Sequence, residues 1–408
     1  MNLYELIRGA FPADLERTAL DGPEGFRYSY ADIEAESARL ARALCNLGAK
    51  PGDRVTVQVE KSPRVLPLYL ACLRAGLVYH PLNTAYRSAE LAYFLGNAEP
   101  RLVISDPGGE AVFRSLEFEA VLTLGADGSG SLWDAAQELR PVFASVPRRD
   151  DDMAALLYSS GTTGRPKGIM LSHGNLAANA QTLVDLWGFT SRDRLLHVLP
   201  VFHVHGLFIA LHCALLSGAS LRWLRKFDPA DVLEALPDCT VMMGVPTYYT
   251  RLLADGHFGA RHCRNMRLFI SGSAPLLTET FETFRARTGH VILERYGMSE
   301  TGMNTSNPIN GERRAGTVGL PLPDVELRVV GPDGAALAPG ETGNLQVRGP
   351  NVFSGYWRMP DKTCEDFTAD GFFDTGDKAQ IAADGYVSIV GRARDMIITG
   401  GLNVYPKE

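Results

Sequence analysis

The sequence is short of the residues that build disulfide frameworks, basic binding surfaces and membrane spans. Only six of its 408 residues are cysteines, at positions 45, 72, 213, 239, 263 and 364, and none forms a C-x-x-C pair. Free buried thiols in a reducing compartment are therefore expected. The 40 Lys and Arg residues against 47 Asp and Glu give a net charge of −7. This balance argues against a nucleic-acid-binding surface and against a polybasic membrane anchor.

Signals for export or membrane insertion are also missing. The first 20 residues, MNLYELIRGAFPADLERTAL, include acidic residues where a signal or transit peptide would be basic and serine-rich. No uninterrupted apolar run reaches the ~20 residues of a membrane span. We therefore expect a cytoplasmic, enzyme-sized protein, monomeric or weakly dimeric, with neither a membrane nor a nucleic acid among its partners.

The pattern of apolar residues predicts an α/β fold. Residues 31–49 have helical spacing, and short apolar runs such as RLVISD, TVMMGV and RLFISG are each followed by turn residues and a helical stretch. This alternation is typical of mixed, mostly parallel sheets flanked by helices, which we expect over residues 1–315. From residue 316 the chain turns to short alternating strands with Pro-Asp-Gly turns. A small antiparallel β subdomain is expected there, over 316–394.

One loop carries the first sign of chemistry. The string YSSGTTGRPKG (158–168) is rich in glycine and hydroxyl groups, yet Pro166 and Gly168 break the Walker pattern on either side of Lys167. Gly161 and Gly164 let successive backbone amides face an anion. Four hydroxyls add donors, from Ser159, Ser160, Thr162 and Thr163. We expect a phosphate-binding loop between the strand at 154–157 and a helix over 175–187; a polar surface loop is the alternative.

The whole string resembles the phosphate loop of the adenylate-forming superfamily, which includes acyl-CoA synthetases, peptide-synthetase adenylation domains and firefly luciferase. The resemblance implies the large N-terminal domain of that fold. It also implies that the loop holds the β- and γ-phosphates of ATP while a carboxylate attacks the α-phosphorus. Thr162 and Lys167 would then be catalytic, with Thr162 also near Mg²⁺. A loop that steadies leaving pyrophosphate has no need of the Walker serine.

Three further strings resemble the nucleotide site of that family. FISGSAPL (269–276) resembles the adenine slot, formed by Gly272, Ser273, Ala274 and Pro275. FFDTGD (372–377) resembles the ribose site, where the Asp377 carboxylate suits a vicinal diol. Arg392, in the string that begins at Gly391, would reach the ribose or a phosphate.

ERYGMSETG (294–302) resembles the motif Y-G-x-[ST]-E-[ST]. The resemblance implies that Tyr296 stacks on adenine, Ser299 bonds the α-phosphate, and Glu300 is catalytic and holds Mg²⁺, which favours hard oxygen ligands. The neighbouring Glu294, Gly297 and Met298 would line the nucleotide site. A solvated surface carboxylate is the alternative for Glu300.

LPVFHVHGL (199–207) carries His203, which resembles the family's catalytic histidine beside the pantetheine tunnel for CoA. On a strand, His203 and His205 would share a face and could hold a metal ion. No carboxylate or cysteine stands at ligand spacing, so a packing or tunnel histidine is expected instead.

The last residues, 391–408, resemble the family's hinge motif, with Asp395 as the pivot and Arg394 in place of the usual lysine. The resemblance implies a C-terminal domain whose lysine reaches the reacting carboxylate. The sequence ends at Glu408, so we expect a domain over 1–394 followed by a hinge stub over 395–408. Such a truncated chain, or alternatively a naturally short relative, would bind ATP and the acid but form acyl-adenylate very slowly.

The acid itself is predicted from residues around Arg295. Strings such as LERYGMSETGMNTSNP and MGVPTYYTRLL closely resemble malonyl-CoA synthetases, which implies malonate, ATP, Mg²⁺ and CoA as ligands. Arg295 would pair with the second carboxylate, because a buried unpaired carboxylate is costly and arginine offers a planar fork. Ser271, Ser273 and Met303 are expected to wall the pocket. For Arg295, the alternative is a surface arginine paired with Glu294. For the protein, the alternatives are a synthetase for another short acid and a nucleotide-binding module without turnover.

Overall fold

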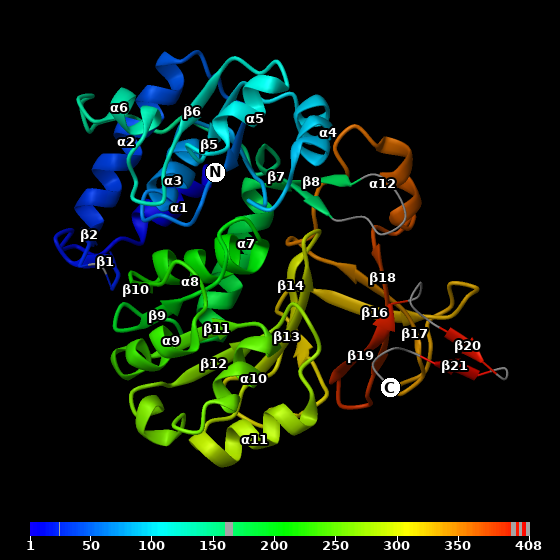
Figure 1. The fold of residues 1–408 in the computed structure, drawn as a ribbon. Coiled ribbons are helices and arrows are strands. Elements are labelled where there is room, and N and C mark those ends of the chain that lie inside the picture. Colours follow the sequence, from blue (N-terminus) through cyan, green and yellow to red (C-terminus); the bar gives the residue numbers. More distant parts are fainter. Residues whose placement is uncertain (24, 160–165, 393–396, 400–401, 405–408) are drawn as a thin grey trace.

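The computed structural model describes residues 1–23, 25–159, 166–392, 397–399 and 402–404. Two sheets lie one above the other with helices around them, and a smaller β unit lies beside them (Figure 1). The expected mixed α/β fold is confirmed. None of the helices within these ranges is long and apolar enough to cross a membrane.

The first sheet has six strands in the order β6-β5-β3-β4-β7-β8. All neighbours are parallel except β7 and β8, which form an antiparallel hairpin. The bounds are β3 Arg54–Gln58, β4 Val78–Pro81, β5 Leu102–Ser105, β6 Val121–Thr123, β7 Met153–Ser159 and β8 Lys167–Ser172. The glycine-rich string is therefore the connection of a hairpin. The helix expected over 175–187 is confirmed as α7, His173–Leu186, but strand β8, which precedes it, was not expected.

The second sheet has nine strands in the order β15-β14-β13-β12-β11-β9-β10-β1-β2. Strands β13 to β1 run parallel, while β2, β14 and β15 are antiparallel additions at the edges. The bounds are β1 Thr18–Asp21, β2 Arg27–Ser29, β9 Arg194–His197, β10 Ser220–Trp223, β11 Val241–Gly244, β12 Leu268–Ser271, β13 Leu293–Met298, β14 Gly302–Ser306 and β15 Leu320–Pro321.

The smaller β unit is antiparallel, as its turn-rich sequence indicates. Its four-stranded sheet has the order β16-β17-β18-β19, with a separate pair β20-β21. The bounds are β16 Glu326–Val330, β17 Gly343–Arg348, β18 Phe373–Ile381, β19 Val387–Arg392, β20 Ile397–Thr399 and β21 Leu402–Val404. Strand β15 belongs to the nine-stranded sheet, so the chain leaves that sheet after Pro321.

The helices cover the sheets. They are α1 Leu3–Gly9, α2 Tyr30–Asn46, α3 Val65–Arg74, α4 Ser88–Ala98, α5 Glu110–Ser115, α6 Ser131–Ala136, α7 His173–Leu186, α8 Leu211–Leu216, α9 Pro229–Ala235, α10 Pro246–Ala254, α11 Thr278–Thr288 and α12 Pro360–Asp366. A side chain caps the start of some of them, such as α1, α2 and α7. Short helices cover Leu236–Asp238 and Ala260–Cys263, and His205–Ala210 forms a π-helix. Ser172 and Asn175 cap α7 reciprocally. All ten residues of α3 are buried, which explains its nearly uninterrupted apolar sequence.

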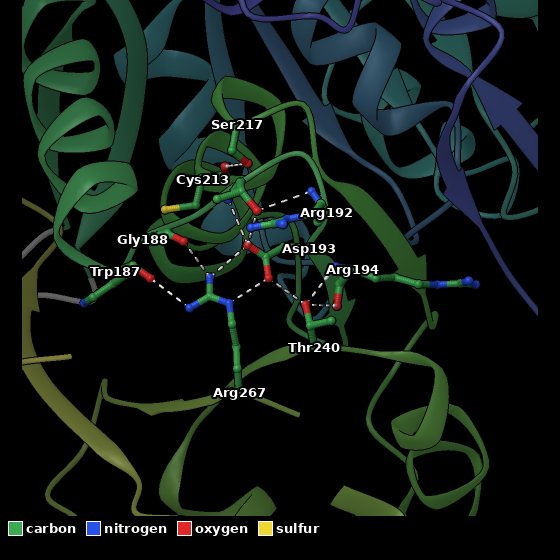
Figure 2. A network of polar contacts seen from close by, with 10 residues as sticks. Trp187, Gly188, Arg192, Asp193, Arg194, Cys213, Ser217, Thr240 and Arg267 are labelled. Carbon is green, nitrogen blue, oxygen red and sulfur yellow. Dashed lines mark hydrogen bonds and ion pairs between the residues drawn. The ribbon is translucent and has the colours of Figure 1, made fainter. Parts of the chain in front are cut away.

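A polar network ties the amino ends of the parallel strands together (Figure 2). The buried Asp193 accepts from Arg267 Nε at 2.7 Å, from Arg267 Nη2 at 2.9 Å and from Thr240 Oγ1 at 2.8 Å. Arg267 also donates to the carbonyl oxygens of Trp187 and Gly188, just after α7. These residues precede β9, β11 and β12, so the network fixes one edge of the sheet and leaves the opposite edge for a site.

The six cysteines are free, as expected. Burial was predicted for all of them, and this was wrong for Cys364, which lies exposed on α12, and in part for Cys45, which is half-buried. The four remaining thiols are buried.

Candidate active site

Several predicted site residues lie at the edge of the nine-stranded sheet where β12 ends beside β13. Because the two strands are parallel neighbours, Ser271 pairs with Glu294 at this edge. The chain then continues from β12 into the 272–276 segment and from β13 into the turn before β14. Ligands of open α/β sheets bind at this edge, so the placement favours a functional site.

Arg295 is the most unusual residue of this edge. Its side chain is 2 % exposed, and neither Nε nor Nη2 has a hydrogen-bond partner among the described residues. Burial lowers the pKa of its guanidinium to about 10, a value that still keeps the group charged at neutral pH. The alternative of a surface arginine is therefore excluded. A buried cation with unused donors calls for an anionic ligand.

Gly272 makes room for this arginine. A Cβ atom at position 272 would lie 2.3 Å from Arg295 Cζ, so any larger residue must displace the guanidinium. The hydroxyl of Ser271, one residue earlier, is fully buried and also lacks a hydrogen-bond partner in the part of the chain described. Met303, the third predicted wall residue, is 2 % exposed and lies beside Gly297.

The two histidines of HVHGL differ from each other in burial. His203 is exposed and lies before the π-helix, whereas His205 is buried as its first residue. The picture of both on one strand was wrong, because β9 ends at His197. His205 Nδ1 lies 3.3 Å from Ser273 Oγ, and burial, reinforced by Arg295, lowers its pKa well below the usual value. His205 is therefore neutral.

The expected adenine slot is an exposed turn. Ser273, Ala274 and Pro275 are exposed, and Ser273 has a φ of 70°, which favours small or polar residues. Glu294 fixes the end of this turn, because its Oε1 accepts from the Leu276 amide at 3.0 Å. An exposed turn of small side chains leaves room for a planar ring such as adenine to lie against it.

Tyr296 and Asp377 are joined across two sheets. The Tyr296 hydroxyl donates to Asp377 Oδ2 at 2.5 Å, and Arg392 Nε lies 3.3 Å from Asp377 Oδ1. The Tyr296 ring packs against the core of the small β unit. Asp377 and Arg392 pair in register between β18 and β19. The structure thus brings together three residues that the sequence separates by up to 96 positions.

Tyr356, a residue that the sequence did not single out, contacts both Lys167 and Glu300. Tyr356 Oη lies 3.0 Å from Lys167 Nζ and 3.4 Å from Glu300 Oε1. The carboxylate of Glu300 is buried, and desolvation raises its pKa despite the opposing effects of nearby Lys167 and Tyr356. The alternative of a solvated surface carboxylate is excluded. Asp366 also lies 3.6 Å from Lys167.

Sequence reasoning missed Tyr356 and Asp366 because they lie 189 and 199 residues beyond Lys167. The tyrosine belongs to the string GPNVFSGYW, where it is indistinguishable from a core aromatic residue. The bridge between Ile169 and Tyr356 brings the segment alongside β8.

Several predicted residues lie outside the part of the chain that the structure describes. These are Ser160, Gly161, Thr162, Thr163, Gly164, Arg394 and Asp395. Ser159 ends β7 and Lys167 begins β8, so they lie on either side of the undescribed residues 160–165. Ser299 lies half-buried in the turn after β13, next to Glu300.

Comparisons with known proteins fit this geometry. A family model described as AMP-binding enzyme matches residues 11–357. The chain is 37% identical over 434 residues to the malonate–CoA ligase ACSF3, mitochondrial, of Mus musculus, covering 95% of this chain and 73% of that protein. It is 35% identical over 388 residues to a feruloyl-CoA synthase of Amycolatopsis sp, covering 94% and 77%.

Among solved structures, the crystal structure of ATP-bound MatB from Rhodopseudomonas palustris is similar over the whole chain. The TM-score is 0.97 at 51% sequence identity, and the match covers 100% of this chain and 82% of that one. The similarity includes both sheets and the small β unit.

Proposed function

The chain belongs to the AMP-binding enzyme family, as an AMP-forming acid–CoA ligase, and we propose that its acid substrate is malonate. One carboxylate oxygen of malonate attacks the α-phosphorus of ATP, and pyrophosphate leaves. The thiolate of CoA then attacks the carbonyl carbon of malonyl-AMP, and AMP leaves as malonyl-CoA forms. The similarity to a malonate–CoA ligase supports this choice.

The observation that carries the proposal is the buried guanidinium of Arg295, whose Nε and Nη2 have no hydrogen-bond partner among the described residues. A monocarboxylate that reacts at phosphorus offers no second charge to this cation. Malonate offers one, at the distance of a single methylene from the reacting carboxylate. Its distal carboxylate would accept from Arg295, with Ser271 and Ser273 as further donors and Met303 as the apolar wall.

The nucleotide would extend from the 272–275 turn toward β8. Tyr296 would lie against the adenine, and Asp377 and Arg392 would hold the ribose, exchanging their present contacts for its hydroxyls. Ser299 would donate to the α-phosphate, while Glu294, Gly297 and Met298 shape this part of the site. Lys167, Ser159 and the undescribed residues 160–164, including Thr162, would bind the polyphosphate, as the resemblance implies.

Glu300 fits a magnesium ion that arrives with the nucleotide. It offers a buried carboxylate, a hard-oxygen donor, and desolvation raises its pKa although nearby Lys167 and Arg392 lower it. No group of three or more His, Cys, Asp or Glu residues that could hold a metal occurs within the described ranges. Mg²⁺ here would take its other ligands from phosphates, water and Thr162, and would neutralise charge on the phosphate oxygens.

CoA would approach past His203, whose exposure suits a tunnel entrance better than a buried structural role. A cytoplasmic location and a monomeric or weakly dimeric state remain proposals from the sequence. The mouse relative carries the word mitochondrial in its name.

A panel of acids tests the substrate. ATP–pyrophosphate exchange, or acid-dependent ATP binding by calorimetry, would be compared for malonate, methylmalonate, propionate and ferulate. We expect malonate to exceed propionate by about 100-fold, the factor typical of losing a buried charge pair. Equal responses to malonate and propionate would contradict the proposal. A response limited to ferulate would favour a synthetase for another acid.

A further inference from the structure

The lysine at the start of β8 is already paired within the protein. Lys167 Nζ lies 3.6 Å from Asp366 Oδ2 and 4.2 Å from the centroid of the Tyr356 ring, in addition to its contact with the Tyr356 hydroxyl. The side chains of Lys167 and Asp366 are 25% and 19% exposed. The ammonium group is thus matched by an aromatic face, a hydroxyl and a carboxylate.

Asp366 has a second partner that keeps it satisfied when Lys167 moves. Its other carboxylate oxygen, Oδ1, lies 2.8 Å from Lys362 Nζ, one turn earlier on α12. That pair raises the pKa of Lys362. Departure of Lys167 therefore leaves no isolated carboxylate, and the long, flexible lysine side chain can exchange partners.

We propose that Asp366 is a positioning residue that holds Lys167 at rest and competes with polyphosphate for its ammonium group. The inference rests on the proposed function, in which Lys167 binds the phosphates of ATP. While the nucleotide is bound, its greater negative charge takes the ammonium group from Asp366. As pyrophosphate leaves, Asp366 takes it back. Competition of this kind weakens polyphosphate binding and assists product release.

Removing the carboxylate tests the competition. In Asp366→Asn, we expect affinity for ATP and pyrophosphate to rise about three- to tenfold by calorimetry at fixed Mg²⁺, within the range for a partly exposed ion pair. The KM for pyrophosphate in acid-dependent exchange should fall correspondingly, with the KM for the acid unchanged. Asp366→Glu should restore the native affinity. Asp361→Asn, the same change at an exposed position of α12, should have no effect.

Asp366→Asn in a Lys167→Ala background distinguishes competition for the lysine from direct repulsion between Asp366 and phosphate. We expect no effect of Asp366→Asn there, because the lysine for which it competes is gone. Equal tightening in both backgrounds would overturn the inference, since the carboxylate would then repel phosphate directly. No tightening in the native background would overturn it as well. If the native chain fails to bind ATP, or if Lys167→Ala binds it equally well, the proposed role of Lys167 fails instead.

Discussion

Two arginines at opposite edges of the nine-stranded sheet are treated differently by the fold. At the amino edge, Arg267 donates from Nε and both terminal nitrogens, to Asp193 and two backbone carbonyls. At the carboxyl edge, Arg295 is more deeply buried, yet Nε and Nη2 have no partner among the described residues. Folding alone accounts for the arrangement of Arg267, because the protein itself supplies the acceptors for its donors. The unpaired donors Nε and Nη2 of Arg295 are explained when a bound ligand supplies their acceptors.

The first prediction removes Asp193, the hydrogen-bond acceptor of Arg267 at the amino edge. Asp193→Ala leaves Arg267 without its carboxylate and Thr240 with only the more distant Arg194 carbonyl oxygen, so the free energy of unfolding should fall by about 3 kcal/mol. Urea denaturation measures this. Ligand binding by the folded fraction should stay native, because the network lies at the edge away from the site. A loss of malonate binding in the folded variant would contradict the separation of the two edges.

The Asp193 network also predicts a pH dependence. Burial alone would raise the pKa of this carboxyl, but hydrogen bonds from Arg267, the Thr190 amide and Thr240 outweigh it and lower the pKa. A lowered pKa in the folded state stabilises the protein above the unfolded pKa of ~3.9, and this contribution is lost as the pH falls through the folded value. Asp193→Asn should therefore flatten the acid limb of the unfolding curve. An unchanged acid limb would contradict this assignment.

The second prediction fills the space beside the unsatisfied arginine. In Gly272→Ala the new methyl group collides with Arg295 Cζ, so the guanidinium must shift. We expect a loss of about 2 kcal/mol of stability, typical of overpacking, and at least about tenfold weaker malonate binding. Gly256→Ala is a matched control, because nothing lies within 4 Å of a Cβ atom there. Native affinity in Gly272→Ala would show that the position of Arg295 is unimportant.

The third and smallest effect is expected from Arg295→Met in the absence of ligand. Replacing an unpaired buried charge by an apolar side chain of similar length removes a desolvation penalty, so stability should stay within about 1 kcal/mol of native or rise. Arg267→Met, the matched control, should lose about 2–3 kcal/mol because Asp193 is left unpaired. Equal losses in the two variants would mean that Arg295 serves the fold.

The fold was largely predictable because its signals are local. The strands RLVISD, TVMMGV and RLFISG and the helix over 31–49 are each specified by their own apolar spacing. Strand β8 was missed because KGIMLS follows the glycine-rich turn without a break, and its pairing with β7 is a tertiary contact. The π-helix at His205 was missed because its hydrogen-bond pattern has no familiar apolar period.

The site was predictable only in its residue types. The motif around Tyr296 predicts which side chains would contact a nucleotide, but a sequence does not show which of their polar atoms already have hydrogen-bond partners. Folding brings together the segments that form the hydrogen bond between Tyr296 and Asp377 and the contact of Tyr356 with Lys167. It also determines that Nε and Nη2 of Arg295 have no partner among the described residues. The partner of Lys167 lies on α12, where the sequence shows only an ordinary charged helix.

The most direct test compares malonate with propionate, which has the same three-carbon chain but one carboxylate, on the native chain and on Arg295→Met. Calorimetry in the presence of ATP and Mg²⁺ gives both affinities for each protein. We predict that the substitution weakens malonate binding by about 100-fold and leaves propionate binding within about threefold of native. Native affinity for malonate in Arg295→Met would contradict the assignment of this arginine to the second carboxylate.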